Sequence, residues 1–212
     1  MRNLRNLDEP EVLRENRANW QQQFLDDPDN NTKRYRYREK SIKDHAKKET
    51  CGKCVYCESK IGHNTPGDIE HKVPTSANKA LHFQWTNLTL ACTECNRRKN
   101  AYFDEEKPFL DPYVDDVEDL VIHYGPVVSW KAGHASSEIT VKILELHNQA
   151  RVELILRKVD LLNEMGERLE RHANESDPIL KEIHWKELQE MQHIGAEYSA
   201  MVRSILSNQE GG

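Results

Sequence analysis

Two pairs of cysteines, each with the spacing Cys-x-x-Cys, constrain the fold of this chain more than any other feature. Cys54 and Cys57 form one pair, and Cys92 and Cys95 form the other. A tight turn with this spacing presents two thiolates on one side, and two such turns supply the four soft ligands of a tetrahedral zinc ion. We therefore predict a structural zinc bound by these four cysteines. Such an ion stabilises a domain whose own apolar core is small.

The sequence allows two choices for the first pair of cysteine ligands. Cys51 forms the same spacing with Cys54, so these two are an alternative first pair. We favour Cys54 and Cys57, because the residues between and after them then fit a motif described below. His63 is a weaker ligand candidate in the same stretch. All five cysteines lie between residues 51 and 95, and thiols gathered in this way in a reducing compartment bind metals more often than they form disulfides.

The segment between the two pairs is longer than a simple zinc ribbon requires. It contains 34 residues, whereas a ribbon has roughly 15 to 20 between its pairs. Single acidic, histidine or asparagine residues are common on protein surfaces, but their combination between two metal-binding turns favours a catalytic insert. This segment holds three side chains of the types that hydrolyse phosphodiesters: Glu70, His71 and Asn87.

Hydrolysis of a phosphodiester needs a base that activates water and a divalent cation that neutralises charge on the phosphate. His71 suits the base, because the pKa of histidine lies near neutral pH. The side-chain oxygens of Glu70 and Asn96 suit a hard cation such as Mg²⁺ or Mn²⁺. Neighbours in a straight strand point to opposite faces, so Glu70 and His71 should lie where their strand bends or ends.

Further residues complete the predicted site. Asn96 directly follows the second cysteine pair, so the zinc ion fixes its position. Asn87 can bridge backbone groups across the loop and thereby orient the strand that carries the base. Lys99 follows Asn96 by three residues, which places both on one helix face, and it can meet a phosphate there. Lys72 is a second predicted nucleic-acid contact.

Composition and charge limit the kinds of protein and partner that this chain can represent. Hydrophobic residues make up 37% of the chain and charged residues 31%, and the formal net charge is −6. Residues 33–48 contain eight basic and two acidic side chains, whereas residues 160–212 contain five basic and eleven acidic ones. We expect different contacts at the two ends, and weak nucleic-acid binding by the chain alone. With no apolar run near the roughly 20 residues of a membrane span and no signal-peptide pattern, we expect a cytoplasmic protein without membrane contact.

The periodicity of apolar residues predicts an α+β fold that is mainly helical, with a small ββα centre. We expect three parts: an N-terminal helical arm with the basic segment (1–50), a zinc-stapled nuclease core (51–112), and a β-hairpin with a helical C-terminal region (113–212). The expected helices cover 11–25, 35–48, a stretch starting near 96, a stretch from 139 to a break at 174, and 179–206. A short strand is expected over 68–73 and hairpin strands over 120–124 and 127–130, and residues 87–91 form a buried stretch before the second cysteine pair.

Between Cys54 and Lys99 the chain resembles a branch of the HNH endonucleases. That branch has the patterns Cys-x-Tyr-Cys-Glu, Ile-Glu-His-x-x-Pro and Trp-x-Asn-Leu-x-Leu-Ala-Cys-x-x-Cys-Asn-x-x-Lys, which this chain carries at 54–58, 69–74 and 85–99. The three motif positions are then filled by His71, Asn87 and Asn96. The resemblance implies a ββα-metal fold with His71 as the general base, Glu70 and Asn96 as ligands of the catalytic cation, and Asn87 orienting the histidine loop. The acidic position is more often aspartate in the wider family.

The branch includes the PtuB-like subunits of Septu-type anti-phage systems and of related retron systems. This resemblance implies an effector subunit of a defence complex, together with an ATPase partner of the PtuA type. We expect a nuclease that cleaves DNA rather than RNA. An effector that cleaves RNA, such as tRNA, is one alternative. A non-catalytic zinc module that binds nucleic acid or protein is another, and the acidic, amphipathic C-terminal helices also fit an assembly role.

Overall fold

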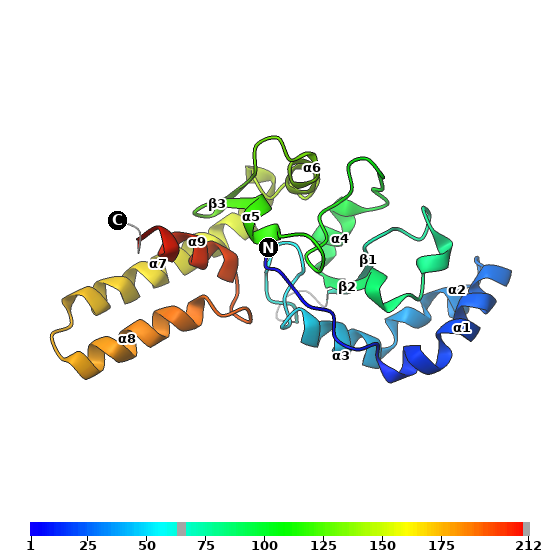
Figure 1. Ribbon diagram of the computed structural model, residues 1–212, viewed down its shortest axis with the longest axis horizontal. Coiled ribbons are helices and arrows are strands. Elements are labelled where there is room, and N and C mark those ends of the chain that lie inside the picture. Colours follow the sequence, from blue (N-terminus) through cyan, green and yellow to red (C-terminus); the bar gives the residue numbers. More distant parts are fainter. Residues whose placement is uncertain (63–66, 210–212) are drawn as a thin grey trace.

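The computed structural model describes residues 1–62 and 67–209, so His63 lies outside the described residues. A two-stranded sheet and one short helix lie at the centre of the molecule (Figure 1). The N-terminal helices lie on one side of this centre, and a β-hairpin with the C-terminal helices lies on the other (Figure 1). The mainly helical α+β fold is thereby confirmed.

The N-terminal arm has a break that the sequence pattern did not predict. Its elements are α1 (Glu11–Asp26), α2 (Asn31–Arg34), the 3₁₀ helix η1 (Tyr35–Arg38) and α3 (Lys40–Glu49). The single helix expected over 35–48 is therefore wrong, because Glu39 leaves the helical conformation with ψ of 140°. Its carboxylate accepts a hydrogen bond from the Ser41 backbone N–H at 2.9 Å, which caps α3 and makes η1 a separate turn.

The central ββα unit matches the expected order of elements. Strand β1 (Asp68–His71) pairs antiparallel with β2 (Leu88–Ala91), and α4 (Thr93–Lys99) follows. The connection between the strands holds two 3₁₀ turns, η2 (Lys79–Leu81) and η3 (Trp85–Asn87). Helix α4 begins three residues before the expected position near 96. Cys92 is its N-cap, with Sγ accepting from the Cys95 backbone N–H at 3.4 Å.

The C-terminal region contains the expected hairpin and two unexpected breaks. Its elements are α5 (Val117–Leu120), β3 (Val121–Tyr124), β4 (Val127–Trp130), α6 (Ala135–Ile143), η4 (Gln149–Arg151), α7 (Val152–Asn174), α8 (Pro178–Met191) and α9 (Ser199–Gln209). The helix expected from 139 is interrupted at 144–151, and the helix expected over 179–206 is interrupted at 192–198. Glu145 and Tyr198 adopt positive φ values of 52° and 51° in these breaks. Residues of both breaks contact the cysteine pairs or their neighbours: Arg151 contacts Cys95, and Tyr198 contacts Ser59.

Two clusters of buried apolar residues meet at β2, whose four residues are all buried. Leu88 and Leu90 belong to the N-terminal cluster with residues of the arm and the β1–β2 connection: Leu13, Phe24, Tyr37, Ile42, Ala46, Ile69, Phe83 and Trp85. Ala91 belongs to the C-terminal cluster with the four cysteines and residues of the later elements, among them Val128, Leu144, Leu154, Leu188 and Met201. Alternate faces of one strand thus join the two halves of the molecule.

Helices α7 and α8 pack antiparallel and project from the body of the protein (Figure 1). Among the described residues, no helix combines the length and the apolarity that a membrane span needs.

Candidate metal centre and active site

The four cysteines predicted as zinc ligands lie together. The Sγ atoms of Cys54, Cys57, Cys92 and Cys95 are all within 4.8 Å of one another, and all four residues are buried. The Cys57 and Cys92 Sγ atoms are 3.8 Å apart, and a tetrahedral zinc with Zn–S bonds of about 2.3 Å requires ligand sulfurs at about this separation. The cluster fits zinc, and it favours Cys54 and Cys57 over the alternative first pair that includes Cys51.

An arginine that the sequence analysis missed lies against this cluster. Arg151 is 8% exposed, and its Nη1 and Nη2 atoms lie 3.6 Å and 3.7 Å from the Cys95 Sγ. Nη1 also donates to the Leu144 carbonyl at 3.0 Å. Four thiolates around Zn²⁺ leave an excess of negative charge, which a buried guanidinium offsets. The break at 144–151 is what turns Arg151 towards the cysteines.

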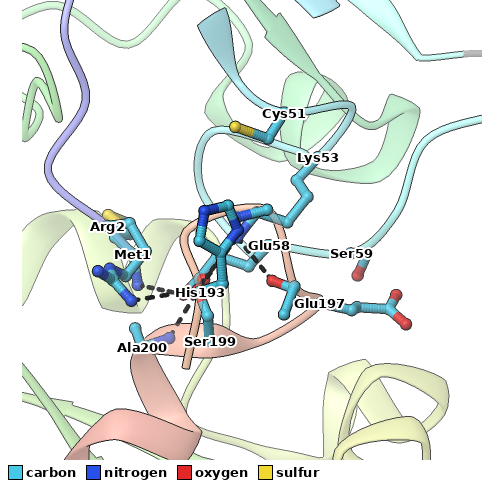
Figure 2. A network of polar contacts seen from close by, with 12 residues as sticks. Met1, Arg2, Cys51, Lys53, Glu58, Ser59, His193, Glu197, Ser199 and Ala200 are labelled. Atoms are coloured by element: carbon cyan, nitrogen blue, oxygen red, sulfur yellow. Dashed lines mark hydrogen bonds and ion pairs between the residues drawn. The ribbon is translucent and has the colours of Figure 1, made fainter. Parts of the chain in front are cut away.

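Glu58, which follows the first cysteine pair, is the centre of a buried network of ion pairs and hydrogen bonds. Met1 N lies 3.0 Å from Glu58 Oε1, and Lys53 Nζ lies 3.1 Å from Oε2 (Figure 2). Ser199 Oγ and the Ala200 N–H also donate to Oε2, at 3.1 Å and 3.3 Å. Burial alone would raise the pKa of Glu58, but the two ammonium groups hold it well below its usual range. This network fixes the first cysteine turn to the start of α9.

His71 is the last residue of β1. A position at the strand end is expected, because Glu70 and His71 would otherwise point to opposite faces of the sheet. Its Nε2 lies 2.9 Å from the His82 carbonyl oxygen. A carbonyl only accepts hydrogen bonds, so Nε2 carries the proton and Nδ1 of the neutral ring keeps its lone pair. Burial lowers the pKa of His71 to about 3, so the ring is neutral near pH 7. The Tyr37 ring meets it edge-on, with centroids 4.6 Å apart.

His82 is a second residue that the sequence analysis missed. It is 1% exposed, and its ring stacks on Phe24 with centroids 4.1 Å apart and on His71 with centroids 4.8 Å apart. Its Nε2 donates to the Arg34 carbonyl at 2.7 Å, and its Nδ1 accepts from Thr75 Oγ1 at 2.8 Å. No spacing in the sequence distinguishes a histidine in this loop, because two of its partners, Phe24 in α1 and Arg34 at the end of α2, lie far from it in the chain.

Asn87 fastens the β1–β2 connection. Its Oδ1 accepts from the Val73 N–H at 2.7 Å, and its Nδ2 donates to the carbonyls of Val73 and Leu81 at 3.0 Å and 3.2 Å. Asn87 is 4% exposed, so these hydrogen bonds are shielded from water. They hold the residues that follow His71 close to the strand that precedes the second cysteine pair.

The predicted phosphate contact Lys99 lies inside the protein. It is 1% exposed, with Nζ 2.6 Å from Glu70 Oε1 and donating to the His71 carbonyl at 2.9 Å. Lys99 therefore joins α4 to β1. Lys72, the other predicted contact, is also paired, with Nζ 2.8 Å from Asp111 Oδ2 and 4.4 Å from the centre of the Tyr113 ring.

Glu70 is buried, and burial raises its pKa despite the nearby Lys99 ammonium. The Lys99 ammonium offsets its charge, with Nζ 2.6 Å from Oε1, and no other described group hydrogen-bonds to that oxygen. Asn96 is half-buried one turn before Lys99 on α4, the helix that Lys99 joins to β1. Carboxylate and amide oxygens are the donors that hard divalent cations use, so Glu70 and Asn96 are of the right chemical type for such a site.

Comparisons with known proteins agree with these features. Residues 54–101 match the family model of the HNH endonucleases. The chain is similar to the Septu protein PtuB of Bacillus mycoides (strain KBAB4), with 29% identity over 188 residues. The match covers 69% of this chain and 63% of the length of that relative. The resemblance to PtuB-like HNH nucleases that the sequence predicts is thereby confirmed.

Proposed function

We propose that this chain is a divalent-cation-dependent endonuclease that hydrolyses phosphodiester bonds of nucleic acid, with DNA as the favoured substrate. The observation that carries the proposal is the state of His71. Its Nε2 is bound to the His82 carbonyl, which leaves a neutral ring whose Nδ1 lone pair can accept a proton. A histidine held in this way takes a proton from water without first having to reorient.

Glu70 and Asn96 would hold the catalytic cation, beside the histidine that activates water. When bound, such a cation would neutralise negative charge on the phosphate and on the leaving oxygen. Asn87 would act by fixing the loop that carries the His82 carbonyl, and thereby the orientation of His71. Lys99 would act by holding Glu70 and the His71 backbone in place. The half-buried Lys72 would contact the nucleic acid.

We further propose that the chain is the effector subunit of an anti-phage complex and that its partner is an ATPase of the PtuA type. The similarity to a Septu protein supports this assignment. The net charge of −6 gives a physical motive, because a partner that supplies substrate would compensate for weak binding by an acidic chain.

A cleavage assay tests the nuclease function. The purified chain, with and without its partner, is offered plasmid DNA, single-stranded DNA and tRNA in Mg²⁺ or Mn²⁺. We expect cutting that requires the added cation. His71→Ala should reduce the rate by about 10²- to 10⁴-fold while the zinc content measured by mass spectrometry stays unchanged. His172→Ala, in the projecting helix α7, is the matched control and should cut normally.

Three outcomes would change the assignment. Cutting of RNA alone would make the chain an RNA-cleaving effector. Absence of cutting under all conditions would favour a non-catalytic zinc module. Loss of zinc in His71→Ala would make this histidine structural.

A further inference from the structure

We propose that residues 34–38 bind unpaired nucleotides of the substrate and deliver the strand to the candidate active site. This segment, here called the Arg-Tyr segment, reads Arg-Tyr-Arg-Tyr-Arg and comprises the end of α2 and all of η1. The inference rests on the proposed nuclease function and specifies the substrate of that same site. Four observations carry it.

The first observation concerns charge. Eight arginines elsewhere in the chain form ion pairs with carboxylates. None of Arg34, Arg36 and Arg38 has such a partner among the described residues, although the chain as a whole is acidic. Arg36 donates instead to Gln23 Oε1 at 2.6 Å. Guanidinium groups without an internal carboxylate are available to phosphates.

The second observation is an exposed aromatic ring between these charges. Tyr35 is 37% exposed, with Arg38 Cζ 4.4 Å and Arg34 Cζ 5.7 Å from its ring centre. A guanidinium over a ring uses its flat face for this contact and keeps its N–H edges for phosphate oxygens. Tyrosine and arginine planes are also the surfaces on which proteins stack unpaired bases.

The third observation is a set of direct contacts between the Arg-Tyr segment and the candidate base. Tyr37 packs edge-on against His71, and the Arg34 carbonyl accepts from His82 Nε2. The His82 carbonyl in turn accepts from His71 Nε2. The segment therefore contacts the base directly through Tyr37 and, through the Arg34 carbonyl, by way of one residue, His82. The Tyr35 ring lies 6.2 Å from the Tyr37 ring, so a base stacked on Tyr35 is one aromatic ring away from His71.

The fourth observation is the distribution of charge over the molecule. Residues 33–48 carry eight basic and two acidic side chains, whereas residues 160–212 carry five basic and eleven acidic ones. Phosphates are therefore attracted to the N-terminal arm and repelled by the C-terminal helices. Charge alone would attract a duplex equally well, but the stacking surface favours bases whose faces are free. We therefore assign single strands, loops and frayed ends to this segment.

The test measures binding separately from cleavage. Fluorescence anisotropy of a labelled oligo-dT, an oligo-U and a duplex of the same length is recorded with the full chain, without added Mg²⁺ or Mn²⁺. We expect the single strands to bind more tightly than the duplex. Tyr35→Ala should weaken single-strand binding about tenfold and leave its salt dependence unchanged, whereas Tyr35→Trp should retain binding.

Arg38→Ala should also weaken binding about tenfold, but it should reduce the slope of log affinity against log salt by about one. Arg38→Lys, which keeps the charge and loses the flat guanidinium, should fall between Arg38→Ala and the wild type. Arg171→Ala, which removes an exposed arginine from α7, is the matched control and should bind within about twofold of wild type. Thermal melting checks that each variant is folded.

The proposal is overturned if Tyr35→Ala and Arg38→Ala bind single strands like the wild type, if they lose duplex binding equally, or if the wild type binds neither form. Failure of the nuclease function looks different. In that case the wild type binds and the variants lose binding, but no nucleic acid is cut when Mg²⁺ or Mn²⁺ is added.

Discussion

The cysteine cluster and the histidine loop lie at opposite ends of the same two strands. Ala91, which precedes Cys92, pairs with Asp68 at one end, whereas Leu88, which follows Asn87, pairs with His71 at the other. The cysteine end is built from two short turns whose four thiols fit one metal ion. The histidine end is held by hydrogen bonds and stacked rings from α1, the end of α2 and the connecting loop. One end thus depends on an ion, and the other depends on packing between distant segments.

This difference implies that the two ends can be damaged separately. Zinc loss should release the C-terminal helices, because Arg151 binds Cys95 and Tyr198 binds Ser59 beside the first cysteine pair. The N-terminal cluster contains no cysteine and should tolerate that loss better.

The largest expected effect is that of Cys95→Ala. Loss of one of four ligands should abolish stoichiometric zinc binding, and structural zinc contributes about 10–16 kcal/mol of apparent binding free energy in small domains. We expect loss of cooperative unfolding in the C-terminal region, measured by circular dichroism, together with loss of zinc, measured by mass spectrometry. Cys51→Ser is the control and should keep its zinc. Retention of zinc in Cys95→Ala would contradict the assignment of the ligands.

A smaller effect is expected for Lys99→Met, which breaks the link between the two ends. The variant leaves Glu70 buried without its cation, and breaking a buried ion pair costs about 3–5 kcal/mol. Chemical denaturation should show this loss in the free energy of unfolding. Glu70→Gln combined with Lys99→Met should recover part of it, because the unpaired charge is then removed. If Lys99→Met has wild-type stability, Lys99 is not the link between α4 and β1.

The smallest effect of the three is expected for Asn87→Ala at the histidine end. It leaves the Val73 N–H and two carbonyls without their partner, and we expect a loss of roughly 2–3 kcal/mol in the free energy of unfolding. Zinc content should not change, because the cysteine end is untouched. Loss of zinc in this variant would show that the two ends are not separable. Asn87→Asp, which places a carboxylate oxygen against the Val73 and Leu81 carbonyls, should be at least as destabilising at neutral pH.

Features that depend on neighbouring residues could be predicted from the amino-acid sequence. The cluster of four cysteines follows from two fixed spacings, and the β-hairpin follows from two alternating runs around Gly125 and Pro126. The order of the ββα unit was also predictable, because these patterns need no distant partner. The strand expected over 68–73 ends two residues earlier, at His71.

Tertiary structure decided the features that depend on distant contacts. The breaks at Glu39, 144–151 and 192–198 were hidden, because apolar periodicity reports which residues are buried and not whether the helix between them is continuous. The spacing of Lys99 from Asn96 predicts that both lie on one face of a helix. It does not predict that α4 packs against β1, which buries Lys99 beside Glu70. His82 gains its position from Phe24 and the Arg34 carbonyl, which lie far from it in sequence. Only folding brings these partners together, so no local sequence pattern predicts that His82 lies against the candidate base.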